Sequence, residues 1–86
     1  MKVIVYSSRN CSRCKALKKW LHKNKLSFKE KNIDDTNIMT ELIMRNIVVL
    51  SAPALETENR VFLSPQIFEK GNSFDPDFIK NLEVQS

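Results

Sequence analysis

The chain opens with an apolar run and then changes to a helical pattern after a short polar stretch. Residues 2–6 read Lys-Val-Ile-Val-Tyr, which predicts a strand buried on both faces. Polar residues 7–10 follow, and over residues 11–24 apolar side chains recur three and four apart, for example at Leu17 and Leu21. This spacing predicts an amphipathic helix with lysines on its far side.

The next two segments predict a second strand and a second helix. Residues 26–33 include several charges, which favours a strand with at least one solvated side. Asp34-Asp35-Thr36 then supplies N-cap candidates for a helix in which Ile38–Leu42 and Met39–Ile43 form i,i+4 pairs. Residues 47–50, Ile-Val-Val-Leu, fit either a strand or the apolar end of that helix.

The last third of the chain predicts a hairpin and a final helix. Residues 54–56 and 61–63 flank the turn-forming residues 57–59. Asp75-Pro76 is a strong helix start, because an acceptor at the N-cap is followed by proline at the first helical position. The order β-α-β-α-β-β-α implies a parallel first strand pair with a right-handed crossover. We therefore expect an α/β fold with a four-stranded mixed sheet flanked by three helices.

Length and charge narrow this expectation. A chain of 86 residues suits one domain, residues 1–86. Residues 1–31 hold ten of the fourteen Lys and Arg residues and one acidic residue. Residues 32–86 hold the other four Lys and Arg residues and nine acidic residues. Such asymmetry can indicate nucleic-acid binding, a solvated helix face, or a positive field that steers acidic partners. We favour the solvated face and expect no nucleic acid, because the lysines lack interleaved aromatic residues, apart from Trp20.

The first residues also bear on location. The apolar run at residues 3–6 is too short for a signal peptide or a membrane span. We expect a cytoplasmic monomer that does not bind membranes, in a compartment where thiols are normally kept reduced.

Both cysteines of the chain lie in one tetrapeptide, Cys11-Ser12-Arg13-Cys14. A disulfide between them closes a very small loop and would constrain little of the unfolded chain, so the pair indicates chemistry rather than a structural staple. Cysteines three apart on a helix lie on adjacent positions, where their sulfurs can meet. This pattern predicts a redox-active disulfide.

The two cysteines are expected to have different roles. Cys11 lies where the strand-to-helix turn begins, so free N–H groups and the helix dipole would favour its thiolate. Arg13 and Lys15 would add to this effect, and Arg9 approaches from the other side. The thiol pKa should therefore fall below its reference value of roughly 8.5. Cys11 would attack a partner disulfide, and Cys14, one turn inward, would resolve the mixed disulfide.

A metal site is the competing interpretation of the same motif. One pair of cysteines supplies two of the four ligands of a structural zinc site, and no second cluster follows in the sequence. His22 is the single histidine of the chain and lies two turns further along the predicted helix. We therefore expect no metal and no cofactor, and keep a metal-binding scaffold as the alternative.

Four short motifs follow one another along the chain. They are Val5-Tyr6-Ser7 leading to Cys11-Ser12-Arg13-Cys14, then Asn32-Ile33-Asp34, Ser51-Ala52-Pro53 and Ser73-Phe74-Asp75-Pro76-Asp77. In this order and spacing they resemble the thioredoxin-fold superfamily, and within it the glutaredoxin-like and NrdH-redoxin branch. The resemblance covers nearly the whole chain.

The resemblance implies a thioredoxin-like fold and the activity of a protein-disulfide reductase. It implies that Pro53 is cis and faces the cysteines, and that the Ala52 backbone pairs with a substrate segment as an added strand. Residues 47–50 become the link from the second helix into the proline loop. Implied partners are disulfide-containing proteins, with ribonucleotide reductase as the target in the NrdH branch. The implied electron donor is a thioredoxin reductase or a low-molecular thiol.

Two departures from the glutathione-dependent branch bear on the electron donor. Ser8 stands where those proteins carry Lys, and residues 64–72 hold one glycine where they carry a Gly-Gly motif followed by Asp. We therefore do not expect dependence on glutathione, although Arg9 could partly replace the lysine in binding it. The candidate substrate-binding residues are Ala52, Pro53, Arg9 and Arg13. Ser12 replaces a proline whose absence, in some family members, accompanies an iron–sulfur cluster. Such a cluster is part of the alternative interpretation.

Overall fold

The computed structural model describes residues 2–85 and has the predicted α/β architecture. Its elements are β1 (Ile4–Ser7), α1 (Ser12–Lys23), β2 (Lys29–Asn32), α2 (Thr36–Met44), β3 (Ala54–Glu56), β4 (Val61–Phe62), α3 (Ser64–Ile67), β5 (Phe68–Lys70), β6 (Ser73–Phe74) and α4 (Pro76–Gln85). The first and last residues of the predicted domain, 1 and 86, lie outside the described range.

The main sheet is mixed and has the strand order β2-β1-β3-β4. The pair β1 and β2 is parallel, with Val5 opposite Glu30, as the β-α-β start predicts. Strand β3 runs antiparallel to β1, with Leu55 opposite Val5, and β4 closes the predicted hairpin at one edge. The charged edge strand β2 is largely exposed, which confirms the predicted solvated side of this segment.

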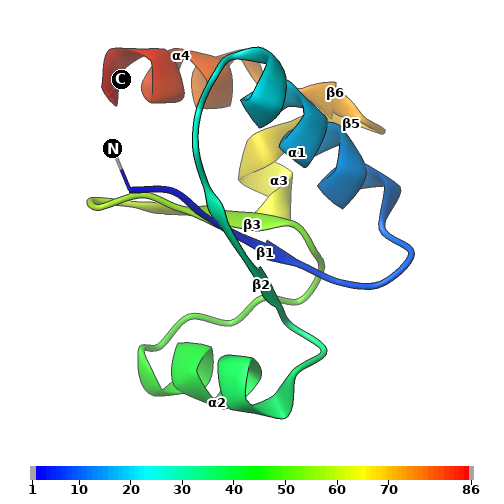
Figure 1. Cartoon of the computed structure of the whole chain (residues 1–86), viewed down its shortest axis with the longest axis vertical. Helices are drawn as coiled ribbons and strands as arrows, with labels where there is room; N and C mark the ends of the chain where they lie inside the picture. The colour runs from blue at the N-terminus through cyan, green and yellow to red at the C-terminus, as the bar shows by residue number, and fades with distance from the viewer. Residues whose placement is uncertain (1, 86) are drawn as a thin grey trace.

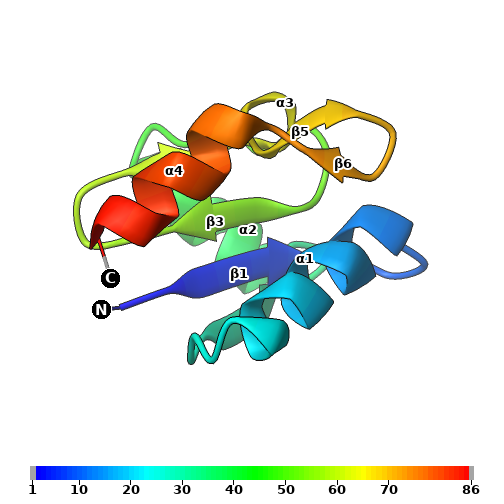
Figure 2. The ribbon, with the colours of Figure 1, turned by 90° about the horizontal axis from the view of Figure 1, so that it is seen from above.

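Helices cover both faces of this sheet, as predicted. Helices α1, α3 and α4 lie on one face and α2 lies on the other (Figure 1). Figure 2 looks onto the face that α1 and α4 cover. Side chains alternate along β1, so Val5 joins the core beneath α1 and α4, while Tyr6 joins a second core beneath α2.

Helix boundaries follow the predicted caps closely. Helix α1 has Cys11 as its N-cap, and Asp35 caps α2 by accepting a hydrogen bond from the Asn37 N–H at 2.8 Å. Asp75 plays the same role ahead of α4, accepting from the Asp77 N–H at 2.8 Å. Leu17 and Leu21 are fully buried on the inner face of α1, which confirms the predicted amphipathic helix.

The prediction of only three helices and one sheet is incomplete. Residues 64–74 add the four-residue helix α3 and a separate two-stranded sheet, β5–β6. These elements are too short to carry a helical or alternating period, so pattern analysis could not detect them. Tertiary contacts hold them instead: Ile67 and Phe68 are buried in the core, and the Phe68 and Phe74 rings stack at 5.1 Å.

One further boundary differs from the sequence prediction, and one ambiguous segment is resolved. Residues 26–28 precede β2 rather than belonging to it, and Lys25 adopts a left-handed φ of 59° as the chain leaves α1. Residues 47–50 form a link between α2 and the proline loop, as the family resemblance implied. Within this link Val49 is buried, whereas Leu50 is 93% exposed.

None of the helices within residues 2–85 has the length and apolar character needed to cross a bilayer.

Candidate active site: the Cys11–Cys14 dithiol

The first cysteine sits at the N-terminus of α1, where the sequence placed it. Cys11 has extended backbone angles and acts as the N-cap, with its Sγ accepting a hydrogen bond from the Cys14 N–H at 3.1 Å. In most helices a serine, threonine or aspartate oxygen fills this position. Here a sulfur fills it, so negative charge on Cys11 would be stabilised by an N–H group and by the positive end of the helix dipole.

A left-handed residue sets the position of this cap. Asn10 has a φ of 52°, which turns the chain sharply between β1 and α1. Asparagine tolerates this region better than most residues with a side chain. The Arg9 N–H donates to Asp34 Oδ2 at 3.1 Å, which ties the turn to the loop after β2. An asparagine directly before a helix cap was the sequence signal for this turn, and pattern analysis overlooked it.

The two cysteines are joined in a disulfide and differ in exposure. Cys11 is half-buried, whereas Cys14 is 2% exposed and faces inward with Leu17 and Leu21. This arrangement confirms that the two sulfurs can meet within one helical turn. It also confirms that Cys14 lies further inward than Cys11.

The proline loop approaches the dithiol. The Ala52–Pro53 peptide bond is cis, and Pro53 is fully buried directly before β3. The Ala52 carbonyl oxygen lies 3.8 Å from Cys11 Sγ. The structure therefore brings Ala52, which the family resemblance identified, to the first cysteine.

An open pocket of about 540 Å³ surrounds Cys11. Four separate segments line it: residues 8–13, residues 33–34, residues 50–52 and Asn72. Its size falls in the range of sites that bind small ligands or short segments of chain. Arg9 and Arg13 both belong to its lining, and so does Asp34.

The Arg13 side chain has partners that the sequence did not indicate. Its Nε donates to the Gly71 carbonyl oxygen at 2.7 Å, and its Nη1 donates to Ser64 Oγ at 3.3 Å. The guanidinium also stacks over the Phe68 ring, 5.1 Å from its centroid. Arg13 thus connects the dithiol motif to residues 64–71, in addition to contributing positive charge near the cysteines.

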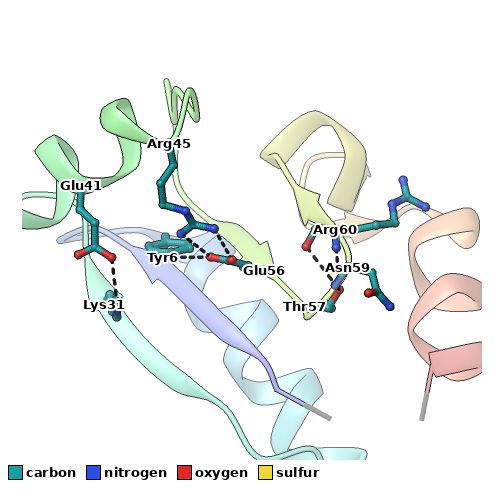
Figure 3. Close-up of polar contacts among 8 residues, drawn as sticks. All are labelled: Tyr6, Lys31, Glu41, Arg45, Glu56, Thr57, Asn59 and Arg60. Carbon is teal, nitrogen blue, oxygen red and sulfur yellow. Dashed lines mark hydrogen bonds and ion pairs between the residues drawn. The ribbon is translucent and has the colours of Figure 1, made fainter.

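A part-buried polar network joins Tyr6 of β1, Glu56 of β3 and Arg45 at the end of α2 (Figure 3). The Tyr6 hydroxyl donates to Glu56 Oε1 at 2.7 Å, and Arg45 forms a two-point ion pair with the same carboxylate. Arg45 ends α2 and Glu56 belongs to β3, so this ion pair closes the segment that contains Pro53. Sequence analysis assigned Tyr6 no polar role, because its partner lies 50 positions away.

This network shifts the ionisation of its members. Hydrogen bonds from Arg45 are the largest cause of the lowered pKa of Glu56, and Tyr6 adds to the effect. Burial, followed by the hydrogen bond to Glu56, raises the pKa of Tyr6 to about 12. The network therefore holds an ionised carboxylate and a neutral phenol over the whole physiological pH range.

A second polar cluster connects α1 to the edge strand. Glu30 accepts from Lys18 Nζ at 2.8 Å and from the buried Ser7 hydroxyl at 2.7 Å. The hydrogen bond from Lys18 is the largest cause of the lowered pKa of Glu30. Lys15 and Lys19 on the same helix are exposed, which fits the solvated basic face favoured from the sequence.

Residues 2–85 contain no group of three or more His, Cys, Asp or Glu side chains arranged to hold a metal ion. His22 is exposed, and its ring meets the Phe28 ring edge-on with 5.2 Å between the centroids. It follows Cys14 by eight positions.

Comparison with known proteins agrees with this site. The glutaredoxin family model matches residues 3–74. The glutaredoxin-like protein NrdH of Lactococcus lactis subsp. cremoris (strain MG1363) is 35% identical over 60 residues, which cover 70% of this chain and 82% of that protein. The NrdH protein of Lactococcus lactis subsp. lactis (strain IL1403) matches to the same extent.

Solved structures share the fold at lower identity. The glutaredoxin-like NrdH-redoxin from Escherichia coli superposes with a TM-score of 0.65 at 22% identity, covering 95% of both chains. The thioredoxin-like protein BC3987 superposes with a TM-score of 0.67 at 16% identity, covering 93% of this chain and 97% of that one. These likenesses confirm the predicted thioredoxin-like fold.

The family match and the NrdH relatives also decide between the two interpretations of the cysteine pair, favouring a redox dithiol over a metal-binding scaffold. The chain belongs to the glutaredoxin family, and it is an NrdH-like thiol–disulfide oxidoreductase.

Proposed function

We propose that this protein reduces disulfides in other proteins, with Cys11 as the attacking cysteine and Cys14 as the resolving cysteine. The observation that carries this proposal is the asymmetry of the pair. Cys11 opens onto the pocket and caps α1, whereas Cys14 is 2% exposed. A partner disulfide can therefore reach the first sulfur but not the second.

The first step forms a mixed disulfide. The Cys11 thiolate attacks one sulfur of the partner disulfide, and the other partner sulfur leaves as a thiolate that takes up a proton. The Cys14 N–H, which donates to Cys11 Sγ, stabilises the attacking anion in the reduced protein. The same hydrogen bond makes Cys11 a better leaving group in the next step.

The second step releases the partner. Cys14 gives up its proton and attacks Cys11 Sγ, the mixed disulfide breaks, and the second partner sulfur leaves as a thiol. Two electrons have then passed from the dithiol to the partner, and the Cys11–Cys14 disulfide of the structure is the product. An external reductant must return two electrons and two protons before the next cycle.

The proline loop is proposed to hold the partner during these steps. The Ala52 carbonyl lies beside Cys11, at the point where an extended partner segment would pair with backbone groups. Pro53 cannot donate a backbone hydrogen bond, so pairing falls on Ala52. Arg9, exposed at the same pocket, would contact acidic or carbonyl groups of the partner.

We further propose a cytoplasmic cycle with a thioredoxin-reductase-type donor and a protein target such as ribonucleotide reductase. Support for this donor comes from two sources. The E. coli NrdH-redoxin, which shares the fold, has a thioredoxin-like activity profile. In addition, residues 64–72 lack the Gly-Gly motif of the glutathione-dependent branch. Reducing the Cys11–Cys14 disulfide with thioredoxin reductase and with glutathione, side by side, distinguishes the two donors.

Single cysteine substitutions test the assigned roles. Cys14→Ser should accumulate a covalent adduct with a disulfide-containing protein, because nothing resolves the mixed disulfide, whereas Cys11→Ser should form no adduct and lose all activity. Non-reducing electrophoresis and intact mass measure the adduct. If the adduct forms on Cys11→Ser instead, the roles are reversed. If neither variant forms one, the covalent pathway is wrong.

A further inference from the structure

Arg13 lies inside the dithiol motif, yet its guanidinium is bound by a segment far along the chain. Its three contacts are the Gly71 carbonyl oxygen, the Ser64 hydroxyl and the Phe68 ring. Gly71 is 58 positions away in sequence. An arginine between two redox cysteines is thus an anchor for another part of the fold.

These contacts require the shape of arginine. Nε donates to the Gly71 carbonyl oxygen and Nη1 to the Ser64 hydroxyl, while the guanidinium carbon lies over the Phe68 ring. A lysine ammonium carries the same charge but cannot make both hydrogen bonds while stacking on Phe68. Ser64 is 2% exposed, so its hydroxyl would lose its partner in a variant without arginine.

The anchored segment is too small to hold its own position. Strands β5 and β6 have three and two residues, and an isolated two-stranded hairpin is marginally stable at best. Figures 1 and 2 both show this hairpin beside the first turn of α1. The stack of Phe68 on Phe74 fixes its base, and the bond from Arg13 to Gly71 fixes its turn.

The turn of this hairpin contributes to the redox pocket. Asn72 directly follows Gly71 and lines the pocket together with Cys11, Ser12 and Ala52. The position of Asn72 therefore depends on the carbonyl that Arg13 holds. A small disulfide would contact the pocket only near Cys11, whereas a polypeptide segment is long enough to contact Asn72 as well.

We propose that Arg13 is a positioning residue that holds the Gly71–Asn72 turn as one wall of the redox pocket, and that this wall selects polypeptide disulfides over small ones. The inference rests on the proposed function of the same site. It assigns Arg13 a role that its charge alone does not provide, and it assigns residues 71–72 to substrate selection.

The test compares two disulfides in the same variants. The measured quantity is the kcat/KM for reduction of insulin disulfides divided by the kcat/KM for 2-hydroxyethyl disulfide. Taking this ratio cancels any change in the reactivity of Cys11 itself. We expect Arg13→Lys to lower the ratio about fivefold, mainly through a higher KM for insulin, because positive charge remains but the two-point anchor is lost.

A second variant changes the same turn and leaves Arg13 in place. Gly71 has a φ of 55°, and a Cβ there would meet no atom within 4 Å, so Gly71→Ala adds backbone strain and no clash. It should lower the same ratio, while reduction of 2-hydroxyethyl disulfide stays within about twofold of the parent. Lys70→Ala, an exposed change in the same hairpin, is the matched control and should leave the ratio unchanged.

Hydrogen exchange separates positioning from charge. Backbone amides of residues 68–74 should exchange faster in Arg13→Lys than in the parent, because the hairpin has lost its anchor. A parental ratio in both Arg13→Lys and Gly71→Ala would overturn the proposal. A parental ratio in Arg13→Lys with a lowered ratio in Arg13→Ala would overturn it too, since charge would then be sufficient. If the parent protein reduces neither disulfide, the proposed function itself fails.

Discussion

The polar network of Tyr6, Glu56 and Arg45 should contribute a large part of the stability of this small protein, and Glu56→Ala tests this. Tyr6 is 1% exposed and its hydroxyl donates to Glu56. Removing the carboxylate leaves that hydroxyl buried without its acceptor. It also leaves Arg45 at the end of α2 without the partner that ties this helix to β3.

The expected loss can be assembled from its two parts. A hydrogen bond to a charged group stabilises the folded protein by about 1.5–3 kcal/mol. Most of this free energy is lost when the variant leaves the buried Tyr6 hydroxyl without a partner. The ion pair adds about 0–1 kcal/mol, because the Arg45 side chain is 41% exposed and solvent screens it. Glu56→Ala should therefore lower the free energy of unfolding by about 2–3 kcal/mol.

Thermal or urea unfolding measures this loss, with the single tryptophan, Trp20, as the fluorescent probe. For a domain of this size a loss of 2–3 kcal/mol lowers Tm by about 10–20 °C. Glu41→Ala is the matched control on the same side of the sheet. Its contact with Lys31 is long, at 3.9 Å, and exposed, so its loss should stay under about 1 kcal/mol.

A double-mutant cycle isolates the hydrogen bond itself. In a Tyr6→Phe background no hydroxyl is left unpaired, so Glu56→Ala should cost about 1–2 kcal/mol less than it does in the parent. Equal losses in the two backgrounds would refute the assignment of the stability to the Tyr6–Glu56 bond. A Glu56→Ala loss no larger than that of Glu41→Ala would refute the whole argument.

Two further predictions concern pH. The pKa values of Glu56 and Glu30 are lowered from 4.5, so the stability that these carboxylates contribute is complete above pH 4.5 and is lost as the pH falls through the lowered values. In Glu56→Gln the unfolding free energy should therefore fall less steeply with decreasing pH in the acid range. Tyr6 is the single tyrosine and its pKa is raised from 10.0 to about 12, so the ultraviolet absorbance of phenolate should titrate near pH 12 in the native protein and at lower pH in Glu56→Ala. The contribution of Tyr6 to stability is complete below pH 10 and should be lost as the pH rises through 12. A native midpoint near pH 10 would contradict the buried hydrogen bond.

Local features of the redox site could be predicted because their causes lie within a few residues. The change from an apolar run to i,i+3 and i,i+4 spacing located the start of α1, and this start placed Cys11 at the cap. Asp35 and Asp75 marked the starts of α2 and α4, because each carboxylate accepts from an N–H group two positions further along the chain.

The small elements after β4 escaped prediction for the opposite reason. Helix α3 and strands β5 and β6 have too few residues to carry a period, and their stability comes from burial of Ile67 and Phe68 against distant side chains. Resemblance to the family identified Pro53 as cis, a property for which the local pattern gave no signal.

The sequence by itself determined the elements up to β4 and the last helix, the position of the dithiol at a helix start and the polarity of the helix faces, since each depends on neighbours along the chain. The tertiary structure decided which residues meet across it. Arg13 binds Gly71, Tyr6 binds Glu56, and the Ala52 carbonyl approaches Cys11, over 58, 50 and 41 positions respectively. Such pairs depend on strand order and register, which arise when the whole core packs, and no periodicity along the chain encodes them.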